Sequence, residues 1–345
     1  MKQAERPGRG PLVVQQSFPQ PRATTNPYIV MLRDSISALP NVQLRTFGWR
    51  AALLGRYDVF HVHWPEILLA GHSRAKTWLR QLLTVALLVR LRLTRTPVVR
   101  TLHNVKRPAG LSRTASSILA LLDRQTSLVI LLNSSTVAPD GVPSETIVHG
   151  HYRGWFARYP KPEARPGQLS YFGLIRPYKG VDRLLTAFAG LPGDYTLEVA
   201  GNPSADLVTP LTELASRDPR VKLIPRYIPD EELVRVACSA ELVVLPYREM
   251  HNSGGALTAL SLDRPVLVPH NEVNARLSRE VGPGWVHTYR GELTSAVLAR
   301  ALSDVRSGPR ADRPDLSARE WDVAGSRHVA AYRRALTLVR EPRLP

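Results

Sequence analysis

Two loops in the second half of the chain carry residues that suit the binding of a diphosphate. In the first loop, Arg176 and Lys179 follow a short apolar segment that ends at Gly173, and a helix is expected to start at Gly180. Arg presents a planar fork of N–H donors and Lys a point charge, so the pair can hold phosphate oxygens after a parallel strand. Two solvated loop charges would give the same pattern.

The second loop precedes a predicted helix over residues 253–262. Asn252 or Ser253 can cap this helix, and Gly254 and Gly255 leave its first backbone N–H groups open to an anion. An ordinary capped helix is the alternative, and it is the better one for an isolated Asn-Ser-Gly motif. The presence of both loops in one half of the chain favours a diphosphate site.

In the first half, side chains that can move protons stand at the ends of two predicted strands. His63 ends the strand predicted over residues 58–63, Glu66 lies three residues further, and His103 follows the strand predicted over residues 97–102. Open parallel sheets bind ligands at these strand ends, where a carboxylate or an imidazole can act as a general base. A carboxylate paired with an arginine, or a structural histidine, fits the same positions.

Two His-x-His pairs raise the question of a metal. They are His61 with His63 and His149 with His151. Neither pair is joined by a carboxylate or a cysteine at ligand spacing, so we expect no metal site.

The length and composition indicate a two-domain protein of a reducing compartment. A chain of 345 residues with 43% hydrophobic content exceeds what one core usually serves. The single cysteine, Cys238, lies in a helical pattern and cannot form an internal disulfide. The first ten residues are polar and lack the apolar run of a secretion signal, so we expect a cytoplasmic location.

The net charge of +17 is concentrated in the first half of the chain. Residues 1–165 hold 23 Lys and Arg against 8 Asp and Glu, whereas residues 166–345 hold 23 against 21. A basic surface can meet nucleic acid, anionic lipid or an acidic substrate. Aromatic residues are only 7% of the chain and no zinc-finger or stacking motif occurs, so we expect an anionic membrane surface and no nucleic acid.

Apolar segments and helical patterns alternate along the chain. Strands are predicted over residues 12–16, 42–47, 58–63, 97–102, 129–132 and 146–148, with helices over 28–39 and 111–123. After a proline-rich linker over 157–168, strands are predicted over 169–172, 196–200, 221–224, 242–245 and 266–268, and helices over 316–339. This alternation predicts two parallel, doubly wound α/β sheets.

One helix, predicted over residues 74–95, has an apolar centre with cations on both sides. Its neutral stretch, residues 81–89, is much shorter than the roughly 20 apolar residues that a membrane span needs. It can lie on anionic headgroups at a bilayer surface, or it can be a core helix with charged ends. The sequence favours neither interpretation.

The sequence also resembles a known family. The matching segments are Thr24–Tyr28, Tyr57–Glu66, Pro97–Asn104, His149–Phe156, Gly173–Val181, Val243–Tyr247, His251–Gly254 and Val281–Trp285. Together they resemble GT-B glycosyltransferases and, more closely, the β-1,4-mannosyltransferases of xanthan-type exopolysaccharide assembly. They occur in family order over nearly the whole chain, which makes the resemblance specific.

The resemblance implies a GT-B fold with two Rossmann-like, doubly wound parallel-sheet domains that face a cleft. Residues 1–160 would form the acceptor-binding, membrane-facing domain, and residues 168–315 the domain that binds the nucleotide sugar. Residues 316–345 would form C-terminal helices that cross back to the first domain. No metal is expected with the diphosphate.

Site residues are carried over from the family by matching positions. The implied donor-binding residues are Gly173, Arg176, Lys179, Tyr227, Tyr247, Asn252, Ser253, Gly254 and Thr258. The implied acceptor-side residues are Asn26, Tyr28, Trp64 and His151, and His103 matches a histidine that related enzymes place beside the donor sugar. Glu66 is the first choice for the catalytic base on the residues alone, because it lies just beyond a strand end and no acidic residue occurs in the loop over 15–26 or at His103 and Asn104. His63 is expected to orient Glu66 or to act as the base itself.

One departure from the wider superfamily bears on the stereochemistry. Many retaining GT-B enzymes carry a second glutamate, eight residues after a first, that contacts the nucleotide ribose. Here Glu249 is followed at that distance by Leu257, and Thr258 stands at the aligned position. This pattern favours an inverting enzyme.

The expected function is therefore transfer of mannose from GDP-mannose to a polyprenyl-diphosphate-linked oligosaccharide that ends in glucuronate. The product would be β-linked, and the enzyme would be peripheral on the inner face of the plasma membrane. A transferase that uses another nucleotide sugar for a different cell-surface glycan is one alternative. A non-catalytic lipid- or polyanion-binding protein with the same fold is another, although such a protein has no use for two diphosphate loops.

Overall fold

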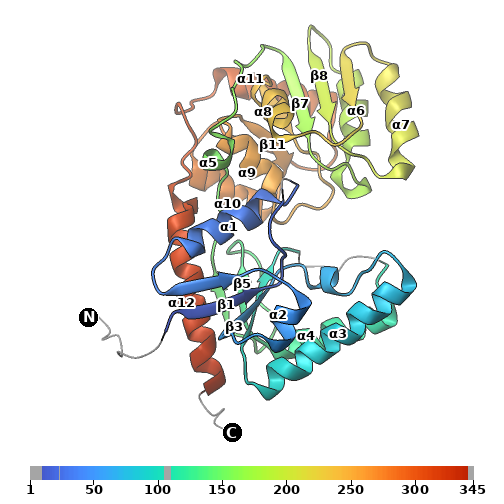
Figure 1. Cartoon of the computed structure of the whole chain (residues 1–345). Helices are drawn as coiled ribbons and strands as arrows, with labels where there is room; N and C mark the ends of the chain where they lie inside the picture. The colour runs from blue at the N-terminus through green and yellow to red at the C-terminus, as the bar shows by residue number, and fades with distance from the viewer. Residues whose placement is uncertain (1–9, 23, 105–109, 341–345) are drawn as a thin grey trace. The chain divides into compact units, whose positions relative to one another are not determined.

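The computed structural model describes residues 10–22, 24–104 and 110–340, and the chain divides into two compact units. Unit 1 consists of Met1–Gly150 together with Arg319–Pro345, and unit 2 consists of His151–Ala318. Each unit has its own six-stranded parallel sheet surrounded by helices (Figure 1). The predicted α/β class and the two doubly wound sheets are confirmed, and the last helix returns to the first unit as expected.

The sheet of unit 1 has the order β2-β1-β3-β4-β5-β6. Its strands are β1 (Leu12–Gln16), β2 (Val42–Arg45), β3 (Val59–Val62), β4 (Val98–Leu102), β5 (Thr126–Leu131) and β6 (Ser144–Thr146). All four residues of β3 are buried, as in a strand covered by helices on both faces.

Helices cover both faces of this sheet. They are α1 (Pro27–Ser37), α2 (Trp49–Leu54), α3 (Arg74–Leu93), α4 (Arg113–Gln125) and α12 (Trp321–Arg340), with a short 3-10 helix, η1 (Pro65–Leu68). Helix α12 contacts α1, β3, β4 and β5, whereas α3 packs against α2 and α4 over a core that includes Phe60, Leu88 and Ile118 (Figure 1). The last helix of the chain thus completes the unit that contains the first strand.

The sheet of unit 2 has the order β12-β11-β10-β7-β8-β9. Its strands are β7 (Gln168–Phe172), β8 (Thr196–Ala200), β9 (Val221–Ile224), β10 (Leu242–Val244), β11 (Val266–Pro269) and β12 (Val286–Tyr289). Its helices are α5 (Arg153–Phe156), α6 (Val181–Ala189), α7 (Ala205–Ser216), α8 (Asp230–Cys238), α9 (Gly254–Ser261), α10 (Glu272–Val281) and α11 (Ser295–Ser307), with η2 (Pro177–Lys179) and η3 (Ser317–Arg319). The loops after β7 and β10 carry the two predicted diphosphate motifs.

Some predicted bounds differ from those of the structure. The strand predicted over residues 129–132 begins three residues earlier, at Thr126, because α4 ends at Gln125 and the chain enters the sheet directly. The strand predicted over 146–148 is Ser144–Thr146, paired with Val129–Leu131 of β5. The last predicted helices are one 3-10 turn and the single helix α12.

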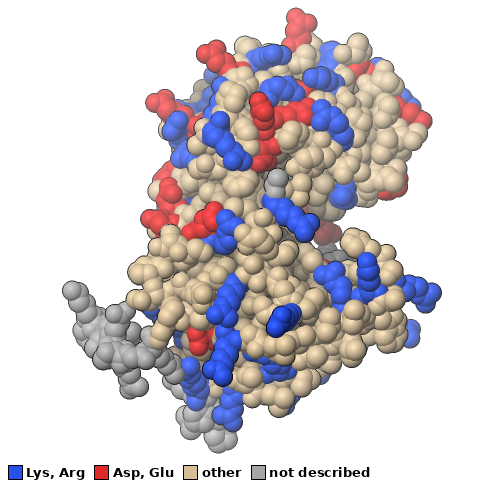
Figure 2. Space-filling model, viewed as in Figure 1, with Lys and Arg blue, Asp and Glu red and all other residues tan. Residues whose placement is uncertain are grey.

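The charge difference between the halves of the chain is a difference between the units. The sequence of unit 1 contains 25 Lys and Arg against 10 Asp and Glu, a net charge of +15, whereas unit 2 contains 21 against 19, a net charge of +2. Figure 2 shows Lys and Arg spread over the part formed by α1 to α4, with few acidic side chains among them. Within residues 10–22, 24–104 and 110–340, no helix has both the length and the apolar content needed to cross a bilayer.

Candidate active site

The carboxyl ends of β3 and β4 bring two histidines together in unit 1. The two strands are parallel neighbours with His61 opposite Val99, so the residues that follow them lie side by side. The Nδ1 of His63 lies 3.0 Å from the Nε2 of His103, and one of these nitrogens donates a hydrogen bond to the other. Two of the predicted catalytic residues are therefore in contact.

A chain of buried hydrogen bonds fixes the neighbouring His61. Gln16 Nε2 donates to the hydroxyl of Tyr332 at 3.4 Å, and this hydroxyl lies 2.7 Å from His61 Nδ1. On the other side of the ring, His61 Nε2 lies 2.8 Å from the hydroxyl of Thr101. One ring nitrogen of the neutral imidazole donates and the other accepts, and in either tautomer each of them has a hydroxyl partner. His61 is thus a structural histidine of the core.

Burial depresses the pKa of every histidine in this cluster. Desolvation and then the charge of His328 lower the pKa of His63 to about 3. Desolvation is also the main cause that lowers the pKa of His149 and of His328 to about 4. The pKa of His61 and that of His103 lie well below 6.5, first through burial and then through neighbouring histidines. All five imidazoles are therefore neutral at neutral pH.

Trp64 has an uncommon backbone conformation between β3 and η1. Its φ of 43° and ψ of 65° lie in the left-handed region, where a bulky residue is strained. The indole stacks on the imidazole of His103, with centroids 3.8 Å apart and planes 17° apart. Tyr28 meets the same ring edge-on at 5.1 Å, and Asn26 caps the helix of Tyr28 by accepting from its N–H at 3.0 Å. Two predicted acceptor-side aromatics therefore hold His103.

A pocket of about 440 Å³ opens beside these rings in unit 1. Its charged and aromatic lining consists of Trp64, Glu66, Arg100, His103, Asp123 and Asp140. Arg100 is held in an ion pair with Asp123, whereas Glu66 is half-buried and Asp140 is exposed. The predicted base and the predicted positioning histidine, Glu66 and His103, therefore line one pocket, and His63 lies behind it, 3% exposed.

In unit 2, the loop after β7 is shaped by two glycines. Gly173 has a φ of 110° and Gly180 a φ of 65°, both unfavourable for other residues. A Cβ at Gly180 would lie 2.3 Å from the carbonyl oxygen of Pro246, so only glycine allows this loop to pack against the end of β10. The approach brings Lys179 to Tyr247: the Nζ lies 3.0 Å from the hydroxyl and 4.5 Å from the ring centroid.

The N-terminus of α9 meets the same pair of side chains. Ser253 caps the helix by accepting from the N–H of Ala256 at 3.0 Å. A Cβ at Gly255 would lie 3.1 Å from the hydroxyl of Tyr247, which places that hydroxyl over the first turn. A lysine, a tyrosine hydroxyl and a glycine-rich helix start therefore converge, as an anion-binding site requires.

The other predicted donor-binding residues are distributed around this point. Arg176 donates to the carbonyl oxygens of Ile175 at 2.7 Å and Asn202 at 3.0 Å, so its guanidinium is bonded to the backbone of unit 2. Asn252 is half-buried in the loop before α9, and Thr258 is buried within that helix. Tyr227 is 58% exposed and precedes α8. The structure brings Lys179 to Tyr247, and Tyr247 to the start of α9 beside Ser253 and Gly255. The roles of all these residues remain predictions.

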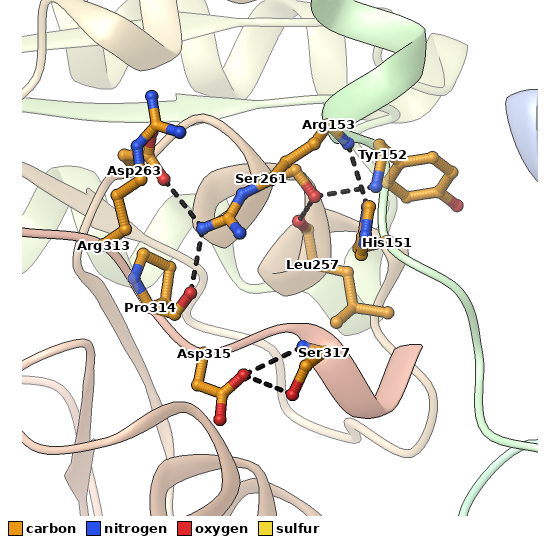
Figure 3. Close-up of polar contacts among 10 residues, drawn as sticks. All are labelled: His151, Tyr152, Arg153, Leu257, Ser261, Asp263, Arg313, Pro314, Asp315 and Ser317. Carbon is orange, nitrogen blue, oxygen red and sulfur yellow. Dashed lines mark hydrogen bonds and ion pairs between the residues drawn. The ribbon is translucent and has the colours of Figure 1, made fainter. Parts of the chain in front are cut away.

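The opposite end of α9 is tied to the segment with which unit 2 begins (Figure 3). The N–H of Tyr152 donates to Ser261 Oγ at 2.8 Å, and Ser261 Oγ donates to the carbonyl of Leu257 at 2.5 Å. Arg153 bonds Asp263 at 3.1 Å and the carbonyl oxygen of Pro314 at 2.9 Å.

His151 belongs to this segment of unit 2. Its Nδ1 accepts from the N–H of Arg153 at 3.2 Å, and the residue is buried. The division between the units therefore falls at residue 151, before the linker predicted over 157–168, because residues 151–153 bond to the helix α9 and to its neighbours. The acceptor-side role of His151 stays a prediction.

The sequence did not identify the partners that α12 supplies to the histidine cluster. His328 and Tyr332 lie one helical turn apart and are buried, with ring centroids 5.8 Å and 5.3 Å from that of His61. Their spacing of four residues puts them on one helix face, and this is the signal that could have indicated an inward-facing polar pair.

No protein-family model matches the sequence. A GDP-mannose:glycolipid 4-β-D-mannosyltransferase of Xanthomonas campestris pv. campestris is 45% identical over 324 residues, which cover 93% of this chain and 91% of the relative. Solved structures show the same fold at low identity. HepE of Anabaena, in complex with UDP-glucose, has a TM-score of 0.60 at 15% identity, with 95% of this chain and 97% of that chain covered. Sucrose-phosphate synthase of Thermosynechococcus elongatus has a TM-score of 0.62 at 14% identity, with 95% and 100% covered. This chain therefore belongs to the GT-B glycosyltransferases, in the family of the Xanthomonas 4-β-D-mannosyltransferase.

Proposed function

We propose that this glycosyltransferase moves mannose from GDP-mannose to a lipid-linked acceptor with inversion at the anomeric carbon. The donor and a glycolipid acceptor are those named for the Xanthomonas relative. The finer identity of the acceptor, a polyprenyl-diphosphate-linked oligosaccharide that ends in glucuronate and serves exopolysaccharide assembly, follows from the resemblance of the sequence to that family. Unit 1 is assigned the acceptor and unit 2 the donor.

The observation that carries the proposal is the convergence at the start of α9. The ammonium of Lys179, 3.0 Å from the hydroxyl of Tyr247, lies with that hydroxyl at a helix N-terminus that begins Gly-Gly. Such a helix start attracts a diphosphate through its unpaired N–H groups and its dipole. Lys179 adds a full charge, and Arg176 is near enough in sequence to add a second. In this proposal the cations and the helix, rather than a metal, balance the diphosphate.

The remaining donor residues are assigned to the nucleoside and the sugar. Tyr227 is exposed before α8, where related enzymes pass the nucleobase. A Cβ at Gly173 would meet no atom within 4 Å, so there is space beside the end of β7, while Asn252 and Ser253 belong to the loop before α9. The buried Thr258 replaces the ribose-binding glutamate of retaining relatives, which supports inversion.

The chemistry then requires one base in unit 1. A hydroxyl of the acceptor gives its proton to the carboxylate of Glu66, and its oxygen attacks the anomeric carbon of mannose while the bond to the diphosphate breaks and GDP leaves. A base works best when its pKa lies near the working pH, and burial holds the pKa of His63 at about 3, which makes it a poor proton acceptor. His103, clamped between Trp64 and Tyr28, is assigned to sugar positioning.

The lipid of the acceptor implies the place of the reaction. An enzyme that uses a lipid-linked sugar must work where that lipid is, at the membrane surface. We propose that the protein acts on the cytoplasmic side, as a peripheral protein of the inner face of the plasma membrane.

The donor assignment is tested by thermal shifts with GDP-mannose, UDP-glucose and UDP-glucuronate. A ligand at 100 times its dissociation constant adds about 2.7 kcal/mol of stability, so only the true donor should raise the melting temperature markedly at low concentration. A larger shift with a UDP-sugar than with GDP-mannose would refute the donor assignment. The linkage of the product is a separate test, because an α-linked mannose would exclude direct displacement.

A further inference from the structure

Helix α3 of unit 1 has two apolar faces, and only one of them is buried. The inner face buries Leu87, Leu88 and Leu91 against α2 and α4. The outer face carries five large apolar side chains that are between 51% and 79% exposed: Trp78, Leu79, Leu82, Val89 and Leu93. Among residues 10–22, 24–104 and 110–340, fourteen large apolar side chains are exposed, and these five belong to one helix.

The five side chains form one stripe along α3. Together with the exposed Ala75 and Ala86, each of them has another member of the stripe three or four residues away, which places all seven on one side of the helix. Ile67 of η1, an element in contact with α3, is also exposed. A contiguous apolar surface of this kind marks a binding face for protein or membrane.

Cations border this stripe on both sides. On a helix, Lys76 and Arg90 lie along one edge of it, and Arg74 and Arg92 along the other. Helix α3 contains no Asp or Glu. Arg90 is bonded to the carbonyl oxygen of Gly55, whereas Arg74, Lys76 and Arg92 are exposed.

The charge pattern distinguishes a membrane from a second copy of the chain. Two α3 helices packed through their outer faces would bring the cations of one beside the cations of the other, with no acidic residue of either helix to compensate. An anionic bilayer instead offers hydrocarbon for the stripe and phosphate for both edges. Trp is enriched at the boundary between headgroups and acyl chains, and Lys and Arg can bury their apolar stems there while their charged ends reach the phosphates.

We propose that α3 lies in the plane of an anionic membrane, with the stripe of Trp78, Leu79, Leu82, Val89 and Leu93 inserted at the acyl boundary. The cations of its edges bind lipid phosphates. The inner face keeps α3 packed in unit 1, so the helix is both a core element and a membrane contact. This assignment concerns a surface rather than the transfer reaction, and it does not depend on which sugar is transferred.

The test is sedimentation of the full chain with vesicles, without substrates. Binding to vesicles of phosphatidylcholine with 30% phosphatidylglycerol is expected to exceed binding to pure phosphatidylcholine and to fall with salt. In the double variant Trp78→Ser/Leu82→Ser, we expect the partition coefficient to drop at least about tenfold, because two inserted side chains are lost. In Arg74→Gln/Arg92→Gln, the partition coefficient should drop roughly thirtyfold, because each cation near an anionic membrane surface contributes about 1 kcal/mol to binding.

The matched control is Val208→Ser/Val323→Ser, which changes two exposed apolar residues on α7 and α12. This variant should bind vesicles like the wild type. Unchanged binding of either α3 variant, or equal binding of the wild type to neutral and anionic vesicles, would overturn the proposal. A dimer in sedimentation velocity that Trp78→Ser/Leu82→Ser abolishes, without vesicle binding by the wild type, would assign the stripe to a second copy instead. The donor thermal shift is independent of all these outcomes.

Discussion

Glu66 and His63 stand three residues apart but lie in different environments. Glu66 is half-buried and lines the 440 Å³ pocket of unit 1, whereas His63 is buried behind it. With Glu66 as the base, Glu66→Gln keeps the shape of the side chain and removes the proton acceptor. Turnover should drop by about 10²–10⁴, the usual contribution of general-base catalysis, while the affinity for GDP-mannose stays unchanged. Initial rates and donor titration measure the two quantities separately.

Asp140 provides the matched control for this variant, since it is an exposed carboxylate in the same pocket. Asp140→Asn should keep the wild-type rate. A near-normal rate of Glu66→Gln would remove Glu66 from the mechanism, and a loss confined to Asp140→Asn would make Asp140 the base. His103→Ala should affect rate and donor affinity together, because its proposed role is to position the sugar.

At the scale of elements, the site of unit 2 depends on how the loop after β7 packs against β10 and α9. Lys179→Ala removes the ammonium that lies 3.0 Å from the hydroxyl of Tyr247. Arg176→Ala removes a guanidinium that could bind phosphate after exchanging its two carbonyl partners. Each change should weaken GDP-mannose binding by about 1.5–3 kcal/mol, roughly 10- to 150-fold, the value of a hydrogen bond to a charged group.

Isothermal titration with GDP and with GDP-mannose measures this loss directly. Arg217→Ala, at an exposed arginine at the end of α7, is the control and should bind both ligands normally. If Arg176→Ala and Lys179→Ala also bind normally, the loop after β7 does not hold the diphosphate.

The sequence was sufficient for most of the strands, although it missed β12 and the helix α2, and for the contacts that the predicted strands dictate. The contact of His63 with His103 follows from two neighbouring strand ends, and the Ser253 cap follows from its position before a glycine-rich helix. The contact of Tyr332 with His61 could not be predicted in this way, since it joins residues 271 positions apart and depends on which sheet the last helix covers. The sequence could not decide whether α3 is a core helix or a helix on a membrane surface. The helix has one apolar face that is buried in the core and a second apolar face that is exposed.

At the scale of the whole molecule, the buried histidines of unit 1 make stability depend on pH. The pKa of His63 is about 3 and those of His149 and His328 are about 4 in the folded protein, against 6.5 for an exposed histidine. The unfolded chain therefore binds more protons between pH 6.5 and 4, so the free energy of unfolding falls as the pH falls through this range. Lowering the pH from 7.5 to 5.5 should cost about 1.4 kcal/mol for each of these histidines.

Urea unfolding at the two pH values measures this loss. In His328→Gln, the difference between pH 7.5 and pH 5.5 should shrink by about 1.4 kcal/mol, because one neutral buried imidazole has been removed. His72→Gln, at an exposed histidine, should leave the difference unchanged. An equal pH dependence in wild type and His328→Gln would contradict the assignment of a buried neutral imidazole at this position.

The course of the chain through the two units also determines when each of them can be completed during synthesis. Helix α12 covers β3, β4 and β5, and buries Tyr332 and Ala335 there. The ribosome must make the whole of residues 151–318 between these strands and this helix, which at about 5–20 residues per second takes roughly 8–34 s. Throughout that interval one face of the nascent sheet is without its helix and exposes its side chains to water or to a chaperone. Unit 2 is continuous in the sequence and has no such wait. Unit 1 provides the first strand to emerge, yet it is completed last, when α12 has been made.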